Sequence, residues 1–228
     1  IAVIKTDAYG HGAVPLAEMF EETPYIWGYA VACMGEARTL RAHGIKKPIL
    51  ILGCVFPDEY EEMVEKEIRA AVYTEEMAKG MADAAVRSGK TAFLHIKIDT
   101  GMGRIGFKVS KESVETISRI SKLPNIKMEG MFTHFARADE YDRSPAMVQL
   151  DRYLKFEKLL EDAGVKIPFC HCSNSAGIIR IPEANLSIVR AGITIYGIYP
   201  SEEVERDIVK MSPVMELKSH VTYVKDVA

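Results

Sequence analysis

Short apolar runs alternate with longer amphipathic segments along the whole chain. A run of about four to eight apolar residues bounded by turn residues is typical of a buried strand, whereas apolar residues spaced three and four apart indicate a helix. Eight segments fit the strand pattern: Ile1–Lys5, Ile26–Ala32, Pro48–Gly53, Ala70–Thr74, Ala92–Asp99, Lys127–Phe135, Pro168–Ser173 and Ser187–Ala191.

Helical segments lie between these strands. The clearest is predicted from Pro145 to Ala163, where apolar side chains share one face, and Gly164 ends it. Three more are predicted: Arg38–His43 before Gly44, Glu75–Ser88 before Gly89, and a helix that Ser110 caps.

Eight strands separated by helices predict an α/β fold, the (β/α)8 TIM-type barrel, whose usual size of ~250 residues is close to the 228 found here. A doubly wound parallel sheet is the structural alternative. We expect residues 1–212 to form the barrel, without its extreme N-terminus, because the chain starts abruptly on a strand and lacks an initiator Met. Residues 213–225 alternate like a strand that leaves the barrel, so residues 213–228 are expected to begin a C-terminal β-rich domain.

The composition is that of an ordinary globular protein, with 48% apolar and 27% charged residues. A formal net charge of -3, with basic residues scattered among acidic ones, argues against nucleic-acid binding. No apolar stretch is long enough to span a bilayer, and the start does not resemble a signal peptide. Cys170 and Cys172 are close, but too few further ligands are present for a zinc site. Reduced cytoplasmic thiols and no metal are therefore expected.

A parallel barrel carries its catalytic groups at the C-terminal ends of its strands. Polar residues fall at these ends: Lys5, Lys97, Asp99, Thr133, His134, His171, Ser173 and Arg190. Lys5 is the most notable, because an ammonium at the end of a buried strand needs a use or a partner. Such a lysine either extends its ammonium to solvent or, when desolvated, acts as a nucleophile toward carbonyl compounds.

The loops after the seventh and eighth strands of a barrel often hold a phosphate. Here the first of them is 173–177, a small polar segment before a short predicted helix, and the second is 191–193, which contains Gly192. Each is also an ordinary loop sequence by itself, but together at these positions they favour a phosphate ligand.

The segment from Val3 to Gly12, Val-Ile-Lys-Thr-Asp-Ala-Tyr-Gly-His-Gly, closely resembles the cofactor-lysine signature of bacterial alanine racemases. The similarity continues in His95–Arg104, Thr133–Ala136, Ala138–Glu140, Asn174–Ala176, Val189–Ile193 and Tyr196–Gly197, and so covers the whole chain. It implies a fold-type III barrel that binds pyridoxal phosphate, followed in the family by a β-rich C-terminal domain.

The resemblance implies a role for each candidate residue. Lys5 would hold the cofactor as an internal aldimine and, once the substrate amine displaces it, act as a base on one face of the substrate Cα. Tyr9 resembles the tyrosine that hydrogen-bonds the phosphate, although an unassigned loop tyrosine more often serves packing. The rest of the phosphate cradle is expected from Asn174, Ser175, and the backbone of Gly192 and Ile193.

Arg190 resembles the arginine that faces the pyridine nitrogen. A guanidinium donates a hydrogen bond but keeps its proton, so the nitrogen stays unprotonated and the cofactor withdraws electrons less strongly. This favours a racemase over related decarboxylases, which have an acid there. The alternative is a surface arginine paired with Glu183 or Asp207. His171 resembles the histidine that holds Arg190 in place.

Lys97 and Arg104 are separated by a glycine-rich turn, which allows the arginine to fold back over the lysine. In the resembling family the matching lysine is commonly carbamylated by CO2, and the resulting anion orients the arginine, which a free ammonium would repel. The alternative is a Lys97 that pairs with Asp99 or another carboxylate. His134 resembles the histidine beside the cofactor ring, and Arg137 stands where a small residue is usual.

These roles imply an alanine racemase that interconverts L- and D-alanine, with Lys5, Lys97, Arg104 and His134 as its catalytic residues, and that supplies D-alanine for peptidoglycan. Three alternatives stay open: a serine, lysine or broad-specificity racemase, a non-catalytic pyridoxal-phosphate-binding homeostasis protein, and a decarboxylase. The family also implies a cytoplasmic homodimer with shared active sites, whose second base is a tyrosine of the partner's C-terminal domain. This chain alone is therefore expected to lack the second base.

Overall fold

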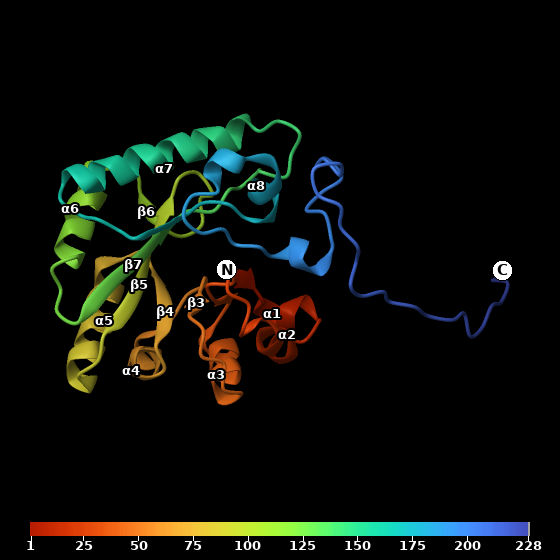
Figure 1. Ribbon diagram of the computed structural model, residues 1–228, viewed down its shortest axis with the longest axis horizontal. Helices are drawn as coiled ribbons and strands as arrows, with labels where there is room; N and C mark the ends of the chain where they lie inside the picture. Colours follow the sequence, from red (N-terminus) through yellow and green to blue (C-terminus); the bar gives the residue numbers. More distant parts are fainter. Residues whose placement is uncertain (228) are drawn as a thin grey trace.

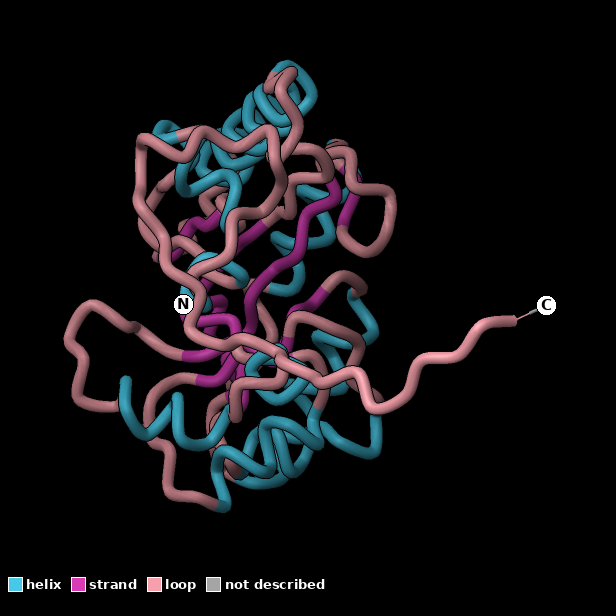
Figure 2. Tube along the Cα trace, turned by 90° about the vertical axis from the view of Figure 1, so that its right-hand side faces the viewer, coloured by secondary structure: helices cyan, strands magenta, loops and turns pink. Residues whose placement is uncertain are grey.

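The computed structural model describes residues 1–227, which fold around a ring of parallel strands with helices outside it (Figures 1 and 2). Within the described residues, the strands follow one another in the sheet as β1 (Ala2–Val3), β2 (Tyr29–Val31), β3 (Ile49–Ile51), β4 (Ile68–Val72), β5 (Ala92–Asp99), β7 (Ile126–Phe132) and β8 (Phe169–His171). A short strand that the sequence did not predict, β6 (Phe107–Lys108), pairs with β5.

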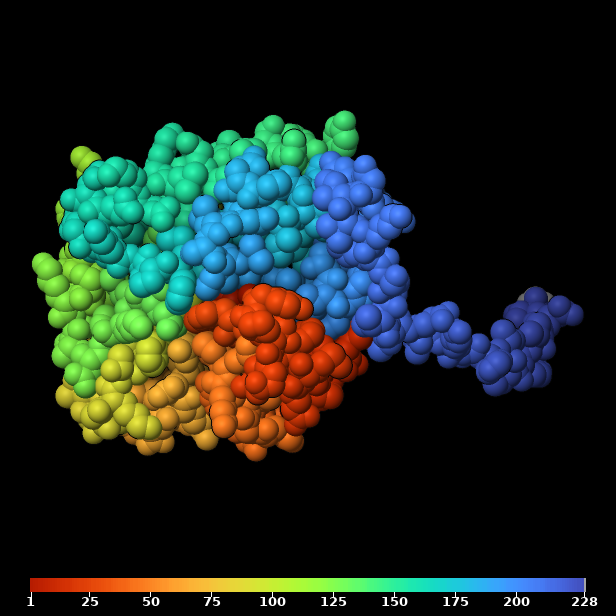
Figure 3. Space-filling model, in the orientation of Figure 1, coloured from red at the N-terminus to blue at the C-terminus, as the bar shows by residue number. Residues whose placement is uncertain are grey.

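Residues 187–191 close the ring between β8 and β1. On one side the Arg190 N–H donates to the Ser173 carbonyl at 3.0 Å, and on the other the Val3 N–H donates to the Ala191 carbonyl at 2.8 Å. Figure 3 shows the first residues, in red, packed directly against this blue part of the chain. The predicted strand Ser187–Ala191 is not a regular strand and forms only an isolated bridge, from Ala191 to Ala2. Because this segment still links β8 to β1, the prediction of a (β/α)8 barrel is confirmed, and the doubly wound sheet is excluded.

The helices are α1 (Lys5–Tyr9), α2 (Ala13–Phe20), α3 (Met34–Ala42), α4 (Tyr60–Glu65), α5 (Glu75–Ser88), α6 (Lys111–Ile120), α7 (Ser144–Asp162) and α8 (Ser175–Arg180), with 3-10 turns η1 (Pro57–Glu59), η2 (Pro182–Ala184) and η3 (Ile193–Tyr196). The predicted bounds of α5 are correct, and Ser110 caps α6 by accepting from the Ser113 N–H at 3.2 Å. The prediction missed α2 and α4, which are too short to show a clear helical period.

The core has two parts that follow the alternation of the strands. In β2, Tyr29 and Val31 belong to the larger cluster that the strands form with the helices, whereas Ala30 belongs to a smaller cluster with Val3 and Leu50. Since neighbouring residues of a strand face opposite sides, the smaller cluster fills the inside of the barrel.

Residues 213–227 form no helix or strand and extend away from the barrel (Figures 1 and 3). The prediction that a second domain begins at residue 213 stays a prediction, and residue 228 lies outside the described residues. Among the helices that the structure describes, none is long and apolar enough to cross a membrane.

Candidate active site

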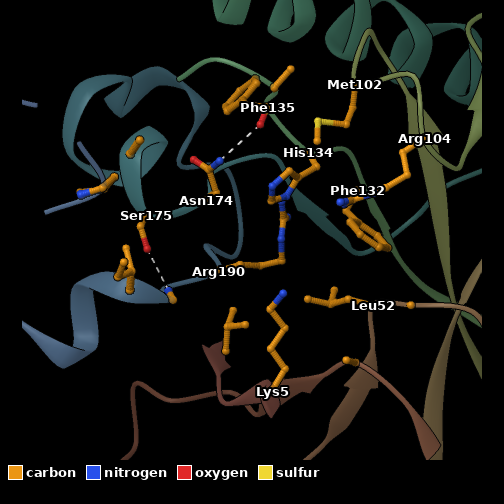
Figure 4. Close-up of a pocket in the computed structure, with 18 of the residues that line it drawn as sticks. Lys5, Leu52, Met102, Arg104, Phe132, His134, Phe135, Asn174, Ser175 and Arg190 are labelled. Atoms are coloured by element: carbon orange, nitrogen blue, oxygen red, sulfur yellow. Dashed lines mark hydrogen bonds between the residues drawn. The ribbon is translucent and has the colours of Figure 1, made fainter. Parts of the chain in front are cut away.

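A cavity of about 690 Å³ opens where the strands end at the C-terminal face of the barrel. Its lining includes every residue that the sequence predicted to be catalytic or cofactor-binding: Lys5, Tyr9, Lys97, Arg104, His134, Asn174, Ser175, Arg190, Gly192 and Ile193. Figure 4 shows the side chain of Lys5 pointing toward Arg190 and His134, which lie on the opposite side of the cavity from the Lys5 backbone. His171 does not line the cavity, because it is fully buried in the barrel behind Arg190.

A left-handed turn directs Lys5 into this cavity. Residues 6–9 have φ between 51° and 54°, a conformation that costs about 1–2 kcal/mol for each residue with a side chain. Glu36 at the start of α3 stabilises the turn, since its carboxylate accepts from the N–H groups of Thr6 and Ala32, each at 2.7 Å. The turn also ends β1 at Val3, earlier than the predicted Lys5. Backbone strain of this kind is typical of active sites.

Tyr9 both packs and presents its hydroxyl to the cavity. Its ring lies 5.3 Å from that of Tyr196, centroid to centroid, and Nζ of Lys5 lies 5.8 Å from the centre of the Tyr9 ring. Partial burial raises the pKa of the Tyr9 hydroxyl. The hydroxyl therefore keeps its proton at neutral pH and is available as a donor.

Ser175 and Gly192 join the two predicted phosphate loops. Oγ of Ser175 accepts from the N–H of Gly192 at 3.0 Å and from that of Thr194 at 3.4 Å. A Cβ at position 192 would lie 3.5 Å from both the Ser175 and the Tyr9 hydroxyl oxygens. Glycine thus keeps the space between these hydroxyls open. Asn174 fixes the same loop by accepting from the Gly177 N–H at 3.0 Å.

Arg190 is held by four hydrogen bonds and is only 3% exposed. Its guanidinium donates to Nδ1 of His171 at 2.9 Å, and to the carbonyls of His171 at 2.9 Å, Thr133 at 2.7 Å and Cys172 at 3.0 Å. Burial lowers the pKa of Arg190 to about 10, so the side chain remains a cation at neutral pH. Within residues 1–227 no carboxylate pairs with Arg190. This excludes the alternative of a surface arginine paired with Glu183 or Asp207.

Lys97 is buried near two other cations, Arg190 and Arg104. Its Nζ donates to the Ile98 carbonyl at 3.0 Å and lies 5.3 Å from the centre of the Phe132 ring. Burial, and then the charge of Arg190, lower the pKa of Lys97 to about 7. Asp99 does not form the alternative ion pair, because it accepts from backbone N–H groups of the following turn, including that of Gly103.

Arg104 and His134 complete the polar lining. Arg104 is exposed at the mouth, and among the described residues no carboxylate pairs with it. Burial, and then the charge of Arg190, lower the pKa of His134 to about 3, so its imidazole is neutral.

Gln149 of α7 was missed by the sequence analysis although it holds two site loops together. Its side chain accepts from the Ala136 N–H at 2.9 Å and donates to Oγ1 of Thr100 at 3.1 Å and to the His134 carbonyl at 3.0 Å. A polar residue that is buried on an apolar helix face was the available signal.

Known proteins resemble this chain throughout. The family described as "Alanine racemase, N-terminal domain" matches residues 1–200. The alanine racemase of Clostridium tetani is 44% identical over 226 residues, which are 99% of this chain and 58% of that protein. That of Methanococcus maripaludis is 45% identical over 227 residues, 100% of this chain and 61% of that protein. The chain thus spans about three fifths of the length of these relatives.

Solved structures of alanine racemases also resemble this chain. The alanine racemase of Clostridium difficile 630 in complex with cycloserine is 43% identical, with a TM-score of 0.94 over 99% of this chain and 62% of that one. The alanine racemase of Bacillus anthracis with bound L-Ala-P is 34% identical, with a TM-score of 0.84 over 93% of this chain and 55% of that one. The chain therefore belongs to the alanine racemase family, whose N-terminal domain it matches.

Proposed function

We propose that the protein carrying this chain interconverts L- and D-alanine with pyridoxal phosphate as its cofactor. The observation that carries the proposal is the pair of Lys5 and Arg190, which face one another across a single cavity that the Ser175 and Gly192 cradle also lines. The relatives named above are alanine racemases, and their sequence identity of 44% and 45% to this chain supports the same activity.

The residues of the cavity fit pyridoxal phosphate. Lys5 offers the primary amine with which its aldehyde condenses, and Arg190 offers a donor to its ring nitrogen. Tyr9 and Ser175 have hydroxyls beside the space that Gly192 leaves open, as a phosphate requires. When bound, the cofactor would withdraw electrons from the Cα–H bond of the amino acid.

The protein's own residues then decide the outcome at Cα. Lys5 removes or returns the proton on one face, as a general base and acid. Arg190 remains a cation that donates without releasing its proton, so the ring nitrogen stays unprotonated and electron withdrawal is moderate. This suits return of the proton rather than decarboxylation. His134 is neutral and contributes no further positive charge beside Arg190.

Lys97 in this proposal is carbamylated. With a pKa of about 7, a large fraction of its side chain is the free amine at neutral pH. The amine attacks the carbon of CO2, a proton leaves, and the product is a carbamate anion. An anion at this buried position removes the repulsion from Arg190 and attracts Arg104, which would orient Arg104 toward the substrate carboxylate.

The whole protein in this proposal is a cytoplasmic homodimer with shared active sites that supplies D-alanine for peptidoglycan. Racemisation needs a second base on the face of Cα opposite to Lys5, and we assign it to the partner subunit's C-terminal domain. Sedimentation of the full-length protein at several concentrations tests the dimer.

The central test is a cofactor-trapping and turnover experiment. The full-length protein with pyridoxal phosphate is reduced with borohydride and mapped by peptide mass, and racemisation of alanine, serine and lysine is compared. We expect the pyridoxyl group on Lys5, its loss in Lys5→Ala but not in the control Lys108→Ala, and fastest turnover of alanine. A label on another lysine alone would refute the role of Lys5, and faster turnover of serine or lysine would refute the substrate.

A further inference from the structure

A chain of buried side chains runs from Arg190 through the inside of the barrel to its opposite end. Nε2 of His171 lies 2.9 Å from Nδ1 of His95, and Nε2 of His95 lies 3.4 Å from Oε2 of Glu129. Arg69 ends the chain by donating from Nε to the same carboxylate at 2.9 Å. Each of these residues is buried, with at most 8% of its surface exposed.

The fold is locally modified to admit this chain. The register between β5 and β7 shifts by one residue between Leu94 and His95, so that Glu129 becomes an extra residue on β7. Such bulges re-aim side chains. The next residue is Gly130, where a Cβ would lie 2.3 Å from Nδ1 of His95. Only glycine leaves room for the His95 ring against this strand.

Each hydrogen bond in the chain has one possible direction. Arg190 is always a donor, so Nδ1 of His171 must accept and carries no proton. The proton of a neutral His171 is then on Nε2, which donates to Nδ1 of His95. His95 in turn has its proton on Nε2 and donates to the carboxylate of Glu129. Both imidazoles are thereby required to be the Nε2–H tautomer.

The charges agree with this assignment. Burial lowers the pKa of both His95 and His171, so both are neutral at pH 7. The hydrogen bonds from His95 and Arg69 lower the pKa of Glu129 to about 2 despite its burial, so the carboxylate is an anion. Arg190 pairs with no carboxylate among the described residues, and these two imidazoles connect it to the Glu129 carboxylate.

We infer that His95 and Glu129 are positioning residues for Arg190: the Glu129 carboxylate, as the acceptor at the far end, reinforces the Nε2–H tautomers of His95 and His171 that Arg190 requires, and so keeps an acceptor facing the guanidinium that would contact the cofactor. The inference rests on the proposed function only in that Arg190 serves a cofactor. If Nδ1 of His171 carried a proton, two donors would face each other and Arg190 would lose one of the four hydrogen bonds that hold it.

The first experiment reads the tautomers directly. The full-length protein is labelled with nitrogen-15 at its histidines, six of which are in this sequence, and imidazole spectra are recorded at pH 7 without cofactor or amino acid. We expect His95 and His171 to be neutral with the proton on Nε2 and a bare Nδ1. An imidazolium or an Nδ1–H tautomer at either residue overturns the inference whether or not the protein racemises alanine.

The second experiment interrupts the row of hydrogen-bonded side chains between Arg190 and Glu129 without leaving a buried charge unpaired. His95→Leu keeps the Arg69 and Glu129 pair but removes the acceptor for Nε2 of His171, whereas His95→Gln restores an acceptor and a donor at the same position. We expect His95→Leu to mix the His171 tautomers, to weaken cofactor affinity and to lower kcat by about tenfold with little change in KM. His95→Gln should recover most of each effect.

Stability alone does not account for these readouts. The control Glu75→Gln removes a surface contact of Glu75 to Arg119 and should leave the histidine spectra and the cofactor affinity unchanged. If His95→Leu keeps the wild-type His171 spectrum, cofactor affinity and kcat, His95 does not position Arg190. A wild type that shows the expected tautomers but no racemisation would instead contradict the proposed function.

Discussion

Oγ of Ser175 accepts a hydrogen bond from the backbone N–H of Gly192 at 3.0 Å, and this contact joins the first residue of α8 to the residue that precedes η3. The two residues are separated by 17 positions in the sequence, yet they line the same side of the cavity. The open space beside them is where the proposal puts the phosphate, which leads to the first prediction.

Ser175→Ala should weaken the binding of pyridoxal phosphate. The change removes a hydroxyl from the cradle and leaves the Gly192 N–H without its acceptor, at a cost of about 1–3 kcal/mol. We expect an affinity loss of about tenfold to a hundredfold, measured by fluorescence titration. Pyridoxal, which has no phosphate, should bind both proteins equally.

Ser173→Ala is the matched control, because Ser173 is fully buried in the same segment and its hydroxyl has no hydrogen-bond partner among residues 1–227. It should not change the affinity ratio of the two ligands. An equal loss for pyridoxal and pyridoxal phosphate in Ser175→Ala would argue against a phosphate at this position.

Glu36→Gln should destabilise the left-handed turn that follows Lys5. The carboxylate accepts one N–H with each oxygen, whereas an amide has one oxygen and would oppose its NH2 to the other N–H. We expect a loss of about 1–2 kcal/mol in the free energy of unfolding, measured with urea, together with weaker cofactor binding. Glu62→Gln, which removes an exposed ion pair with Arg38, should cost less than about 1 kcal/mol. Equal losses in the two variants would show that Glu36 does not brace the turn.

The pKa of Lys97 predicts how stability changes with pH. Burial lowers this pKa from its ordinary value of 10.5 to about 7 in the folded protein, so between these values the unfolded chain binds more protons than the folded one. The free energy of unfolding therefore rises with pH across that window, because the cost of burying the charge disappears. In buffer free of CO2, the wild type should gain stability relative to Lys97→Met as the pH rises from about 7 to 10. No relative gain would mean that Lys97 keeps its proton when folded.

Carbamylation of Lys97 makes a separate prediction. Lys97→Ala should lose most activity, and small carboxylates should restore part of it, since an added anion can take the place of the carbamate near Arg104. Mass spectrometry of the intact protein at high CO2 should detect the added group on wild type only. If carboxylates leave Lys97→Ala inactive and no added mass is found, the carbamate is excluded.

Arg190→Glu should change both the rate and the spectrum. An acid beside the ring nitrogen permits its protonation and strengthens electron withdrawal, so racemisation should slow and absorption at long wavelength should increase when alanine is added. Arg190→Lys keeps the cation and should produce less of this absorption. A racemisation rate and spectrum that remain normal in Arg190→Glu would show that Arg190 does not contact the ring nitrogen.

Local features of the sequence predicted the parts of the fold that depend on nearby residues. The apolar runs predicted β1 to β5, β7 and β8, and Gly89 marked the end of α5, because periodicity and capping act over a few residues. They missed the short β6 and predicted a regular strand at Ser187–Ala191, which forms only an isolated bridge. The positions of Lys5 and Arg190 at strand ends predicted that both would reach one cavity. The family signature assigned their roles.

Only the tertiary structure revealed the contacts between distant segments. Glu36 meets the N–H of Thr6 across 30 residues, and His95 meets His171 across 76. The left-handed turn after Lys5 contradicts the ordinary preference of its residues, and Glu36, from a distant helix, is one of the contacts that stabilise it. Likewise, Glu129 points at His95 because of a one-residue bulge. Closure of the barrel decides these contacts, and no local pattern in the sequence encodes which side chains it brings together.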